Sequence, residues 1–348
     1  MRRCPPPLRL ALLTAMLGLA LPVWAQQPLT VVNFGGEGGS AQKKAFFGAY
    51  ERASGHTITA VEYNGEQTRI QEMVHTGQVT WDVVEVEGPD LHRGCAAGLF
   101  ERLNWAQLGN QSDFIPEAVH PCGMGSFVWA TVLAYDSDRL KTAPQGWADF
   151  WDVAKFPGKR GLRKGARYNL EFALMADGVP VGDVYTLLQT PEGIQRAFKK
   201  LSELKPHIHW WEAGALPVQL LLNGEVVMSS AFNGRIDAAQ RSGQHLNIGW
   251  SGSIYDLDFW VMPKGGSQPA AALQFIAVAG SPAAQAALAR TIAYGPTNTK
   301  ALSQLDPQVL EQLPTSPANS KNALRFDAAF WANHGAALEQ RFHTWLLQ

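Results

Sequence analysis

SFVWATVLAY, residues 126–135, is apolar along almost its whole length and rich in β-branched and aromatic side chains. Such a run predicts a long buried strand. Upstream of it, the short apolar runs LTVVNF at 29–34 and WDVVEV at 81–86 are each followed by glycines and then by a segment with helical spacing. Repeated strand–helix–strand units predict a mainly parallel sheet with helices on both faces.

The same alternation restarts after residue 135. Its elements are expected as helices at 147–153, 169–176, 181–188 and 190–204, strands at 226–231 and 258–262, and helices at 269–279, 282–292 and 327–347. A chain that builds one α/β unit, then a second, and returns to the first must cross between them twice. Residues 126–135 and 258–262 are our candidates for the two connecting strands.

The first 25 residues have the pattern of a secretory signal peptide. Three arginines lie among the first nine residues, residues 10–21 form an apolar run, and VWA at 23–25 matches a small-x-small cleavage site. The apolar run is shorter than the roughly 20 residues that a membrane span needs, although a retained anchor is the alternative. We expect export and cleavage near Ala25, which leaves 323 of the 348 residues.

The charge balance excludes several classes of partner. Cleavage removes three of the 29 basic residues and none of the 30 acidic ones, so the mature chain carries 26 against 30 and a net charge of −4. A weakly acidic chain offers no footprint for nucleic acid or for an anionic lipid surface. The mature length is sufficient for two sizeable cores.

Cys95 and Cys122 are the two cysteines left after cleavage. In the oxidising compartment that an exported protein enters, we expect them to form a disulfide that stabilises the fold by about 3 kcal/mol. Two buried free thiols are the alternative. We expect no metal site, because two cysteines without well-placed histidines make a poor set of zinc ligands.

No constellation in the sequence indicates catalysis or a cofactor. The cluster GGEGGS at 35–40 has neither the GxGxxG nor the GxxxxGK[ST] spacing, so it is either a tight turn or a turn that lines a ligand site. His207 and His209 have no further metal ligand at convincing spacing. The nucleophile pattern GxSxG is absent, and we therefore expect no catalytic residue. A secreted α/β hydrolase is the distant alternative.

Two charged residues stand inside aromatic, apolar stretches. Arg235 lies in MSSAFNGRIDAA at 228–239, and Asp258 lies in YDLDFWVMP at 255–263. A charge in such surroundings is costly unless it has a partner. A guanidinium and a carboxylate could together hold a small molecule with opposite charges at its two ends.

Each of these residues also has a structural interpretation. Arg235 could form an internal ion pair with Asp237 or with Glu225. Asp258 could serve only to cap the end of a strand, with Asp256 as the acid that meets a ligand in its place.

Seven segments resemble the periplasmic spermidine/putrescine-type binding proteins of ABC importers, and they are spread over essentially the whole mature chain. They are WDVVEVE (81–87), FWDVAKFPGKRGL (150–162), NLEFALMADGV (169–179), WWEAGALPVQLLLNGEVVMSSAFNGR (210–235), DLDFWVMPKGG (256–266), YGPTN (294–298) and LPTSPANSKNALRFDAAFWA (313–332). The resemblance implies a two-lobe (type II) periplasmic binding protein fold. Each lobe is then a mainly parallel sheet flanked by helices, and two crossing strands form the hinge.

The resemblance also implies roles for individual residues. Asp258 matches an aspartate that holds a ligand ammonium, Phe232 matches a stacking aromatic residue, and Phe34 matches an aromatic residue on the first strand. Glu87 or Gly88 falls where the first lobe meets the ligand. The remaining candidates for the lining of the pocket are Trp260, Tyr255, Tyr294 and Glu171.

Arg235 departs from the polyamine binders, which tend to have an aspartate at this position for a second amine. An arginine repels a diamine and grips a carboxylate with two hydrogen bonds. In this respect the chain is more similar to the subgroup of receptors for 4-aminobutyrate (GABA). We therefore expect a small ω-amino acid such as GABA as the ligand, with a polyamine (putrescine or spermidine) as the alternative.

The resemblance implies a division of the chain into a first part of lobe 1 at 26–130, lobe 2 at 131–258, and a return to lobe 1 with C-terminal helices at 259–348. It also implies a periplasmic protein that delivers a small zwitterionic or cationic amine to an ABC permease in the inner membrane. Such a protein performs no chemistry, and we expect it to be a monomer without a cofactor.

Overall fold

The computed structural model describes Met1 and residues 27–348, so the expected signal peptide lies almost wholly outside the described residues. The strands are β1 (Leu29–Asn33), β2 (Ile58–Glu62), β3 (Val83–Glu87), β4 (Val119–His120), β5 (Gly123–Asp136), β6 (Arg160–Arg163), β7 (Ile208–Trp211), β8 (Met228–Phe232), β9 (Leu246–Val261), β10 (Gly295–Pro296) and β11 (Leu324–Arg325). They join in the order β2-β1-β3-β9-β5-β8-β6-β7, while β4 and β10 pair with β5 and β11 pairs with β9.

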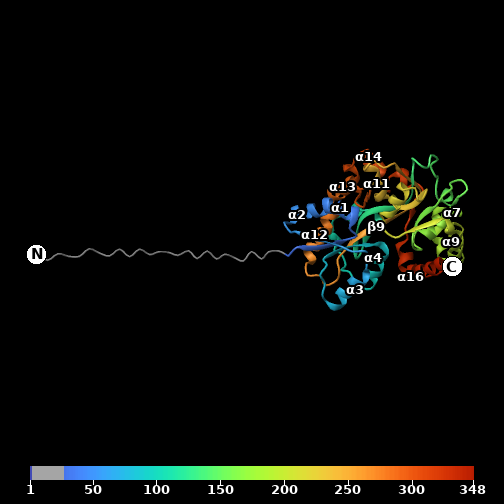
Figure 1. The fold of residues 1–348 in the computed structure, drawn as a ribbon. Helices are drawn as coiled ribbons and strands as arrows, with labels where there is room; N and C mark the ends of the chain where they lie inside the picture. Colours follow the sequence, from blue (N-terminus) through green and yellow to red (C-terminus); the bar gives the residue numbers. More distant parts are fainter. Residues whose placement is uncertain (2–26) are drawn as a thin grey trace.

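Helices surround these strands (Figure 1). They are α1 (Gly36–Gln42), α2 (Gly48–Ser54), α3 (Gln67–Thr76), α4 (Gly88–Ala96), α5 (Trp105–Leu108), α6 (Trp147–Trp151), α7 (Asn169–Ala176), α8 (Val184–Leu188), α9 (Pro191–Leu204), α10 (Leu216–Leu222), α11 (Asn233–Arg241), α12 (Pro269–Ala279), α13 (Pro282–Thr291), α14 (Pro307–Gln312), α15 (Pro317–Ser320) and α16 (Ala328–Leu347). A π-helical segment, η1 (Lys43–Phe47), joins α1 to α2.

The direction of the strands divides the sheet into two lobes. β1 runs parallel to both β2 and β3, and this group with its helices is the first lobe. β6 runs parallel to both β7 and β8, and this group is the second lobe. The long strands β5 and β9 pair antiparallel with each other between the two groups, β9 against β3 and β5 against β8. In Figure 1, α1, α2 and α12 lie on one side of β9, and α7 and α9 lie on the other.

The two-lobe α/β fold is thereby confirmed, with one correction. The strand expected at 126–135 is the main part of β5, but the strand expected at 258–262 is only the end of β9, which begins at Leu246. Residues 247–251 are half-buried or exposed and contain Gly249, so their side chains do not show the apolar pattern of a buried strand. Pairing with β5 forms this part of β9 in spite of its weak local signal. The boundaries between the lobes, expected after residues 130 and 258, fall inside β5 and β9. This division of the chain stays a prediction.

The glycine cluster at 35–40 also differs from the expected turn. Gly36 to Gln42 form α1, and only Gly35 and Gly36 turn the chain, with φ of 68° and 60°. Glycine disfavours a helix interior, but α1 continues through η1 into α2, where Phe46, Phe47 and Tyr50 are buried. Packing of these aromatic side chains in the core of the first lobe outweighs the low helix propensity of the glycines.

No single helix among the described residues is long and apolar enough to cross a membrane. α12 and α13 reach the required length and composition only as a pair that is bent by 63°.

Cys95 on α4 and Cys122 before β5 form the expected disulfide, with their Cα atoms 5.8 Å apart. The bridge closes a loop across a sequence separation of 27 residues and attaches α4 to the start of a strand shared by both lobes. It therefore fixes the first lobe's α4 relative to the central strand pair.

Replacing both cysteines with alanine is expected to lower the free energy of unfolding by about 3 kcal/mol, because the unfolded chain regains the freedom of the open loop. Denaturant unfolding of the double variant and of the wild type, each with and without reductant, measures this difference. A reductant should destabilise the wild type alone. Equal stability of the two proteins without reductant would show that the bridge contributes nothing.

Candidate functional site

Asp258 lies near the end of β9, where it pairs with Glu87 on β3 and with Phe127 on β5. Alternate residues of a strand share a face, so Asp256 and Asp258 face the same side as Phe127 and Trp129 of β5. The Asp258 side chain is buried, and the indole Nε1–H of Trp129 donates to its Oδ1 at 3.0 Å. This bond orients the carboxylate and leaves Oδ2 for another donor.

Four carboxylates gather around this point: Glu85 and Glu87 on β3, and Asp256 and Asp258 on β9. Burial raises the pKa of Asp256 to about 8 and that of Glu85 to about 7. Burial and the charges of the other three acids raise the pKa of Asp258 well above its ordinary value. We call these four residues the acid cluster. It contains more carboxyl groups than the protein supplies with cations.

Glu87 is the exception within the acid cluster. Burial alone would raise its pKa, but the positive charges of Arg167 and Arg163 hold the pKa below its ordinary value. Arg167 donates from Nη1 to the Glu87 carboxylate in an ion pair between the two lobes. Glu87 is therefore ionised and neutralised by the protein itself.

Arg235 lies on the first turns of α11, which begins directly after β8. Asn233 fixes this junction: its Oδ1 accepts from the backbone N–H of Ala130 at 2.9 Å, and its Nδ2 donates to the carbonyl of Ala293 at 2.6 Å. The half-buried guanidinium reaches α1 of the first lobe, where a methyl group added at Gly36 would lie 2.6 Å from Nη2. Gly36 thus provides the space that Arg235 occupies.

Neither internal partner considered for Arg235 is used. Asp237 accepts two hydrogen bonds from Arg241 Nε, at 3.0 and 2.9 Å, and Glu225 accepts from Asn223 at 3.3 Å. Among the described residues, no carboxylate forms an ion pair with Arg235. Its guanidinium is available to a ligand.

Tyr294 connects the two charged poles. Its ring stacks on Phe127, with centroids 4.7 Å apart and planes 11° apart. Burial and the charge of Asp258 raise the pKa of the Tyr294 hydroxyl, whereas Arg235 acts in the opposite direction. Both charges therefore act on the same hydroxyl group. Arg235 and Asp258 thus both lie within electrostatic reach of Tyr294, and their shared role in binding stays a prediction.

Phe232 belongs to the same group of residues. Its ring makes edge contacts with Trp129 at 5.3 Å and with Trp211 at 5.7 Å. Together with Phe127 and Tyr294 these rings provide apolar surface next to the carboxylate of Asp258. Apolar walls that carry a few polar groups are typical of a site for a small molecule.

Phe34 and Glu87 line a cavity of about 420 Å³ between the lobes. Phe34 stacks on Tyr63 with centroids 5.1 Å apart, and its backbone N–H donates to Glu85 at 3.2 Å. The opposite wall comes from the second lobe and from Glu339 and His343 of α16; the second-lobe residues are Arg163, Lys164, Gly165 and Arg167. We call this cavity the interlobe cleft.

Four predicted residues lie elsewhere. Trp260 is fully buried in the core of the first lobe, where it contacts Phe46 and Phe275 with centroids 6.4 and 5.3 Å away. Full burial and contacts with other core side chains make Trp260 a core residue rather than part of a pocket wall. Glu171 on α7 accepts hydrogen bonds from Trp331 at 2.6 Å and from Tyr185 at 2.9 Å, so it joins α7, α8 and α16.

Tyr255 and Gly88 line another cavity, of about 350 Å³, which Asp256 of the acid cluster also lines. Tyr255 faces the side of β9 opposite to Asp258, since the two residues are three apart in a regular strand. Gly88 begins α4, and a methyl group added there would lie 2.7 Å from Cβ of Ala328 on α16. The role of Gly88 in the structure is to permit this close approach of two helices.

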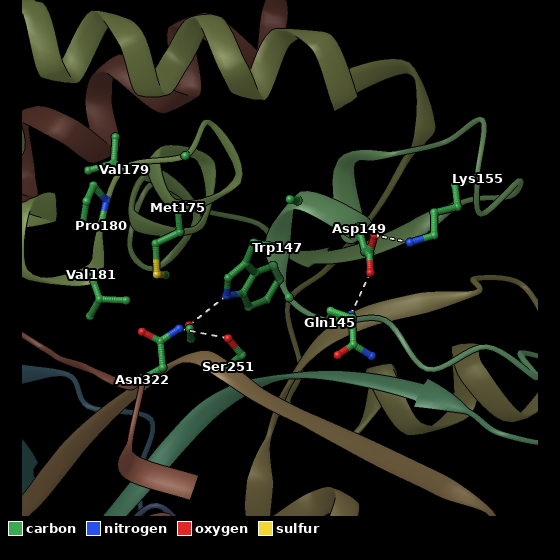
Figure 2. Close-up of a pocket in the computed structure, with 14 residues that line it drawn as sticks. Gln145, Trp147, Asp149, Lys155, Met175, Val179, Pro180, Val181, Ser251 and Asn322 are labelled. Carbon is green, nitrogen blue, oxygen red and sulfur yellow. Dashed lines mark hydrogen bonds and ion pairs between the residues drawn. The ribbon is translucent and has the colours of Figure 1, made fainter. Parts of the chain in front are cut away.

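A third cavity, of about 410 Å³, lies in the second lobe beside Trp147 (Figure 2). Its polar groups bond to one another: Asp149 pairs with Lys155 at 2.8 Å, and Asn322 donates to Ser251 at 2.9 Å. None of the predicted site residues lines it. It has no free charge to select a ligand, and we do not assign it to the site.

Trp129, Phe127 and Arg167 are site residues that sequence reasoning missed. Phe127 and Trp129 are two residues apart in the strand expected at 126–135. Residues at that spacing share one face of a strand, and this was the signal that could have found them. Arg167 lies in a polar loop before α7, and no local pattern marks it.

One group of possible metal ligands occurs among the described residues: Cys95, His120 and Cys122, whose ligand atoms lie within 4.8 Å of one another. The two cysteines are joined as a disulfide and have no thiolate to offer. Burial lowers the pKa of His120 to about 4, and its Nδ1 accepts from the backbone N–H of Cys122 at 3.2 Å. This group is structural.

Comparison with known proteins agrees with this architecture. Residues 45–318 match the family of bacterial extracellular solute-binding proteins, and the chain belongs to that family. It is 52% identical to the gamma-aminobutyric acid-binding protein of Pseudomonas aeruginosa over 334 aligned residues, and the aligned part covers 95% of each chain. It is 22% identical to the spermidine/putrescine-binding periplasmic protein of Escherichia coli over 270 aligned residues, which make up 75% of this chain and 76% of the other.

Two solved structures are also similar. A GABA receptor shares 33% identity and a TM-score of 0.84, over 92% of this chain and 98% of that one. An ABC transporter substrate-binding protein from Bradyrhizobium japonicum shares 35% identity and a TM-score of 0.86, over 92% of this chain and 99% of that one. The names of these relatives describe proteins that bind a solute.

The acid cluster predicts how stability depends on pH in the ligand-free protein. The pKa of Asp256 is raised to about 8 in the folded state, so the folded protein keeps a proton that the unfolded chain releases above its ordinary pKa near 4. The free energy of unfolding should therefore fall as the pH rises between these values, by up to about 1.4 kcal/mol per pH unit for each such group.

Asp256→Asn should flatten this dependence, because the amide resembles the protonated acid and does not titrate. Denaturant unfolding at several pH values between about 5 and 8 measures the slope. Asp306→Asn, at an exposed carboxylate, is the matched control and should keep the wild-type slope. An unchanged slope in the Asp256 variant would exclude that residue as the source.

Proposed function

We propose that this protein captures a small ω-amino acid, with GABA the leading ligand, between its two lobes and delivers it to an ABC permease in the inner membrane. One observation carries the proposal: among the described residues neither Arg235 nor Asp258 has an ion-pair partner, and both act on Tyr294. A ligand with a carboxylate at one end and an ammonium at the other satisfies both poles at once.

Arg235 would hold the ligand carboxylate, because its planar guanidinium can donate two parallel hydrogen bonds to it. Asp258 would accept the ammonium at Oδ2, since Trp129 already occupies Oδ1. Phe127, Phe232 and Tyr294 would cover the methylene groups between them. Closing the lobes over the ligand excludes water, which strengthens both ionic contacts.

The gamma-aminobutyric acid-binding protein of Pseudomonas aeruginosa, at 52% identity, supports this choice of ligand. A polyamine is the second candidate, because the three acids besides Glu87 exceed what a single ammonium needs and because a spermidine/putrescine-binding relative matches at 22% identity. Arg235 argues against it, since a guanidinium would face the second ammonium.

Export by a cleaved signal peptide, action as a monomer and the absence of enzymatic activity belong to the same proposal. The family of extracellular solute-binding proteins supports an exported binding protein.

Isothermal titration with GABA, putrescine and spermidine tests the ligand. We expect tight binding of GABA and weak binding of both polyamines. Arg235→Ala should weaken GABA binding by about 3 kcal/mol, roughly a hundredfold, because it leaves the ligand carboxylate buried without a partner. Asp258→Asn should weaken it as well, because the ammonium loses its counter-charge.

Arg241→Ala provides the matched control on the same helix. Arg241 pairs with Asp237 at 2.9 Å and takes no part in the proposed pocket, so the affinity for GABA should not change. Tight spermidine binding by the wild type would overturn the choice of ligand. An unchanged GABA affinity in Arg235→Ala would remove that residue from the site.

A further inference from the structure

The acid cluster contains a second carboxylate well placed for a second ammonium group. Glu87 on β3 and Asp258 on β9 are register partners in an antiparallel ladder. Side chains at such positions lie on one face, with Cβ atoms roughly 5 Å apart. Two free carboxylates at this spacing would favour a diamine or polyamine over a ligand with one ammonium.

Glu87 is not free in the structure. Arg167, from the loop between β6 and α7 in the second lobe, donates to its carboxylate across the interlobe cleft. The two side chains are only 20% and 24% exposed, so solvent screens this pair less than a surface ion pair. Arg163 also faces the cleft and lies 6.0 Å over the ring of Phe232, but among the described residues no ion pair joins it to Glu87.

The backbone holds Arg167 in this position. The carboxylate of Glu339 on α16 accepts from the backbone N–H of Ala166 at 2.9 Å and from that of Arg167 at 3.1 Å. Tyr168, the next residue, is buried and has a φ of 71°, a left-handed conformation that is unfavourable for a tyrosine. A conformation of this kind persists only where the surroundings impose it. The loop therefore presents Arg167 to the first lobe in a fixed geometry.

We propose that Arg167 is a specificity-determining residue, which neutralises Glu87 and so excludes ligands with a second ammonium group from the cleft. This inference rests on the proposed function and extends it. Arg235 selects for the carboxylate at one pole, and Arg167 selects against a second cation at the other. Selectivity of this kind comes from a contact that penalises the wrong ligand as well as from contacts that favour the right one.

The charges support this division of roles. With Arg167 in place, the ammonium of an ω-amino acid meets Asp258, and Glu87 needs no further partner. A diamine would have to place its second ammonium beside either Arg167 or Arg235, and both positions are repulsive. Without the charge of Arg167, Glu87 has no ion-pair partner, keeps only the more distant charge of Arg163, and faces Asp258 as a second carboxylate.

Arg167→Gln tests the inference by the ratio of the affinities for GABA and putrescine, measured by isothermal titration on the mature protein. The ratio should shift towards putrescine by about tenfold or more. The variant removes the guanidinium that repels the second ammonium and frees the carboxylate of Glu87 to attract it. Arg167→Lys keeps the charge and should keep the ratio near that of the wild type. A purely structural role would lower both affinities in parallel.

Glu87→Gln combined with Arg167→Gln removes the second carboxylate together with its partner, so the gain in putrescine affinity should disappear. Arg196→Gln is the matched control, because Arg196 pairs with Asp177 on the surface of the second lobe at 2.6 Å; it should change neither affinity. Thermal unfolding shows whether each variant is folded. If Arg167→Gln does not fold, Arg167→Met replaces it in the comparison of the two affinities.

The two proposals fail separately. A wild type that does not bind GABA overturns the proposed function, whereas the putrescine measurements still report whether Glu87 is masked. A ratio that stays unchanged in Arg167→Gln, or a gain that survives in the double variant, overturns the role of Arg167 and leaves the proposed function standing.

Discussion

The antiparallel ladder between β5 and β9 is the constraint on which the rest of the structure depends. Each parallel group contributes only short strands of four or five residues, and these two strands of 14 and 16 residues join them into one sheet. The ladder also supplies the residues of the site: Phe127 and Trp129 come from β5, and Asp256 and Asp258 come from β9. A single set of backbone hydrogen bonds thus determines both how the lobes are connected and how the acid pole is built.

The site is unusual in its balance of buried charge. A carboxylate out of water must either keep a proton or find a cation. The protein gives Glu87 the guanidinium of Arg167, gives Glu85 the side chain of Gln42, and leaves Asp256 and Asp258 with one hydrogen bond each. At the other pole Arg235 has space, provided by Gly36, but no anion among the described residues. In the proposed binding mode, the carboxyl group of Asp258 and the guanidinium of Arg235 restrict the ligand more narrowly than the shape of the cleft does.

Local pattern predicted the parts of this protein that are uniformly buried. The strand at 126–135 was recognisable because every residue from Ser126 to Ala134 is buried, whereas the first half of β9 was not, because its exposed and half-buried residues depend on the ladder. Arg235 and Asp258 stood out as charges among aromatic residues. The bond from Trp129 to Asp258 joins residues 129 apart, and that from Arg167 to Glu87 joins residues 80 apart. Contacts over such distances follow from the fold and have no signature in neighbouring residues.

Two irregularities in the β5–β9 register, between Gly125 and Phe127 and between Thr131 and Leu133, bracket the segment that bears Phe127 and Trp129. A strand bends and twists most readily at such points, since a residue there leaves the regular ladder. Bending of β5 would therefore concentrate at the two ends of this segment, between which the register from Phe127 to Thr131 is regular. The hydrogen bond from Trp129 to Asp258 lies within this segment, so a bend at either of its ends would leave that bond intact.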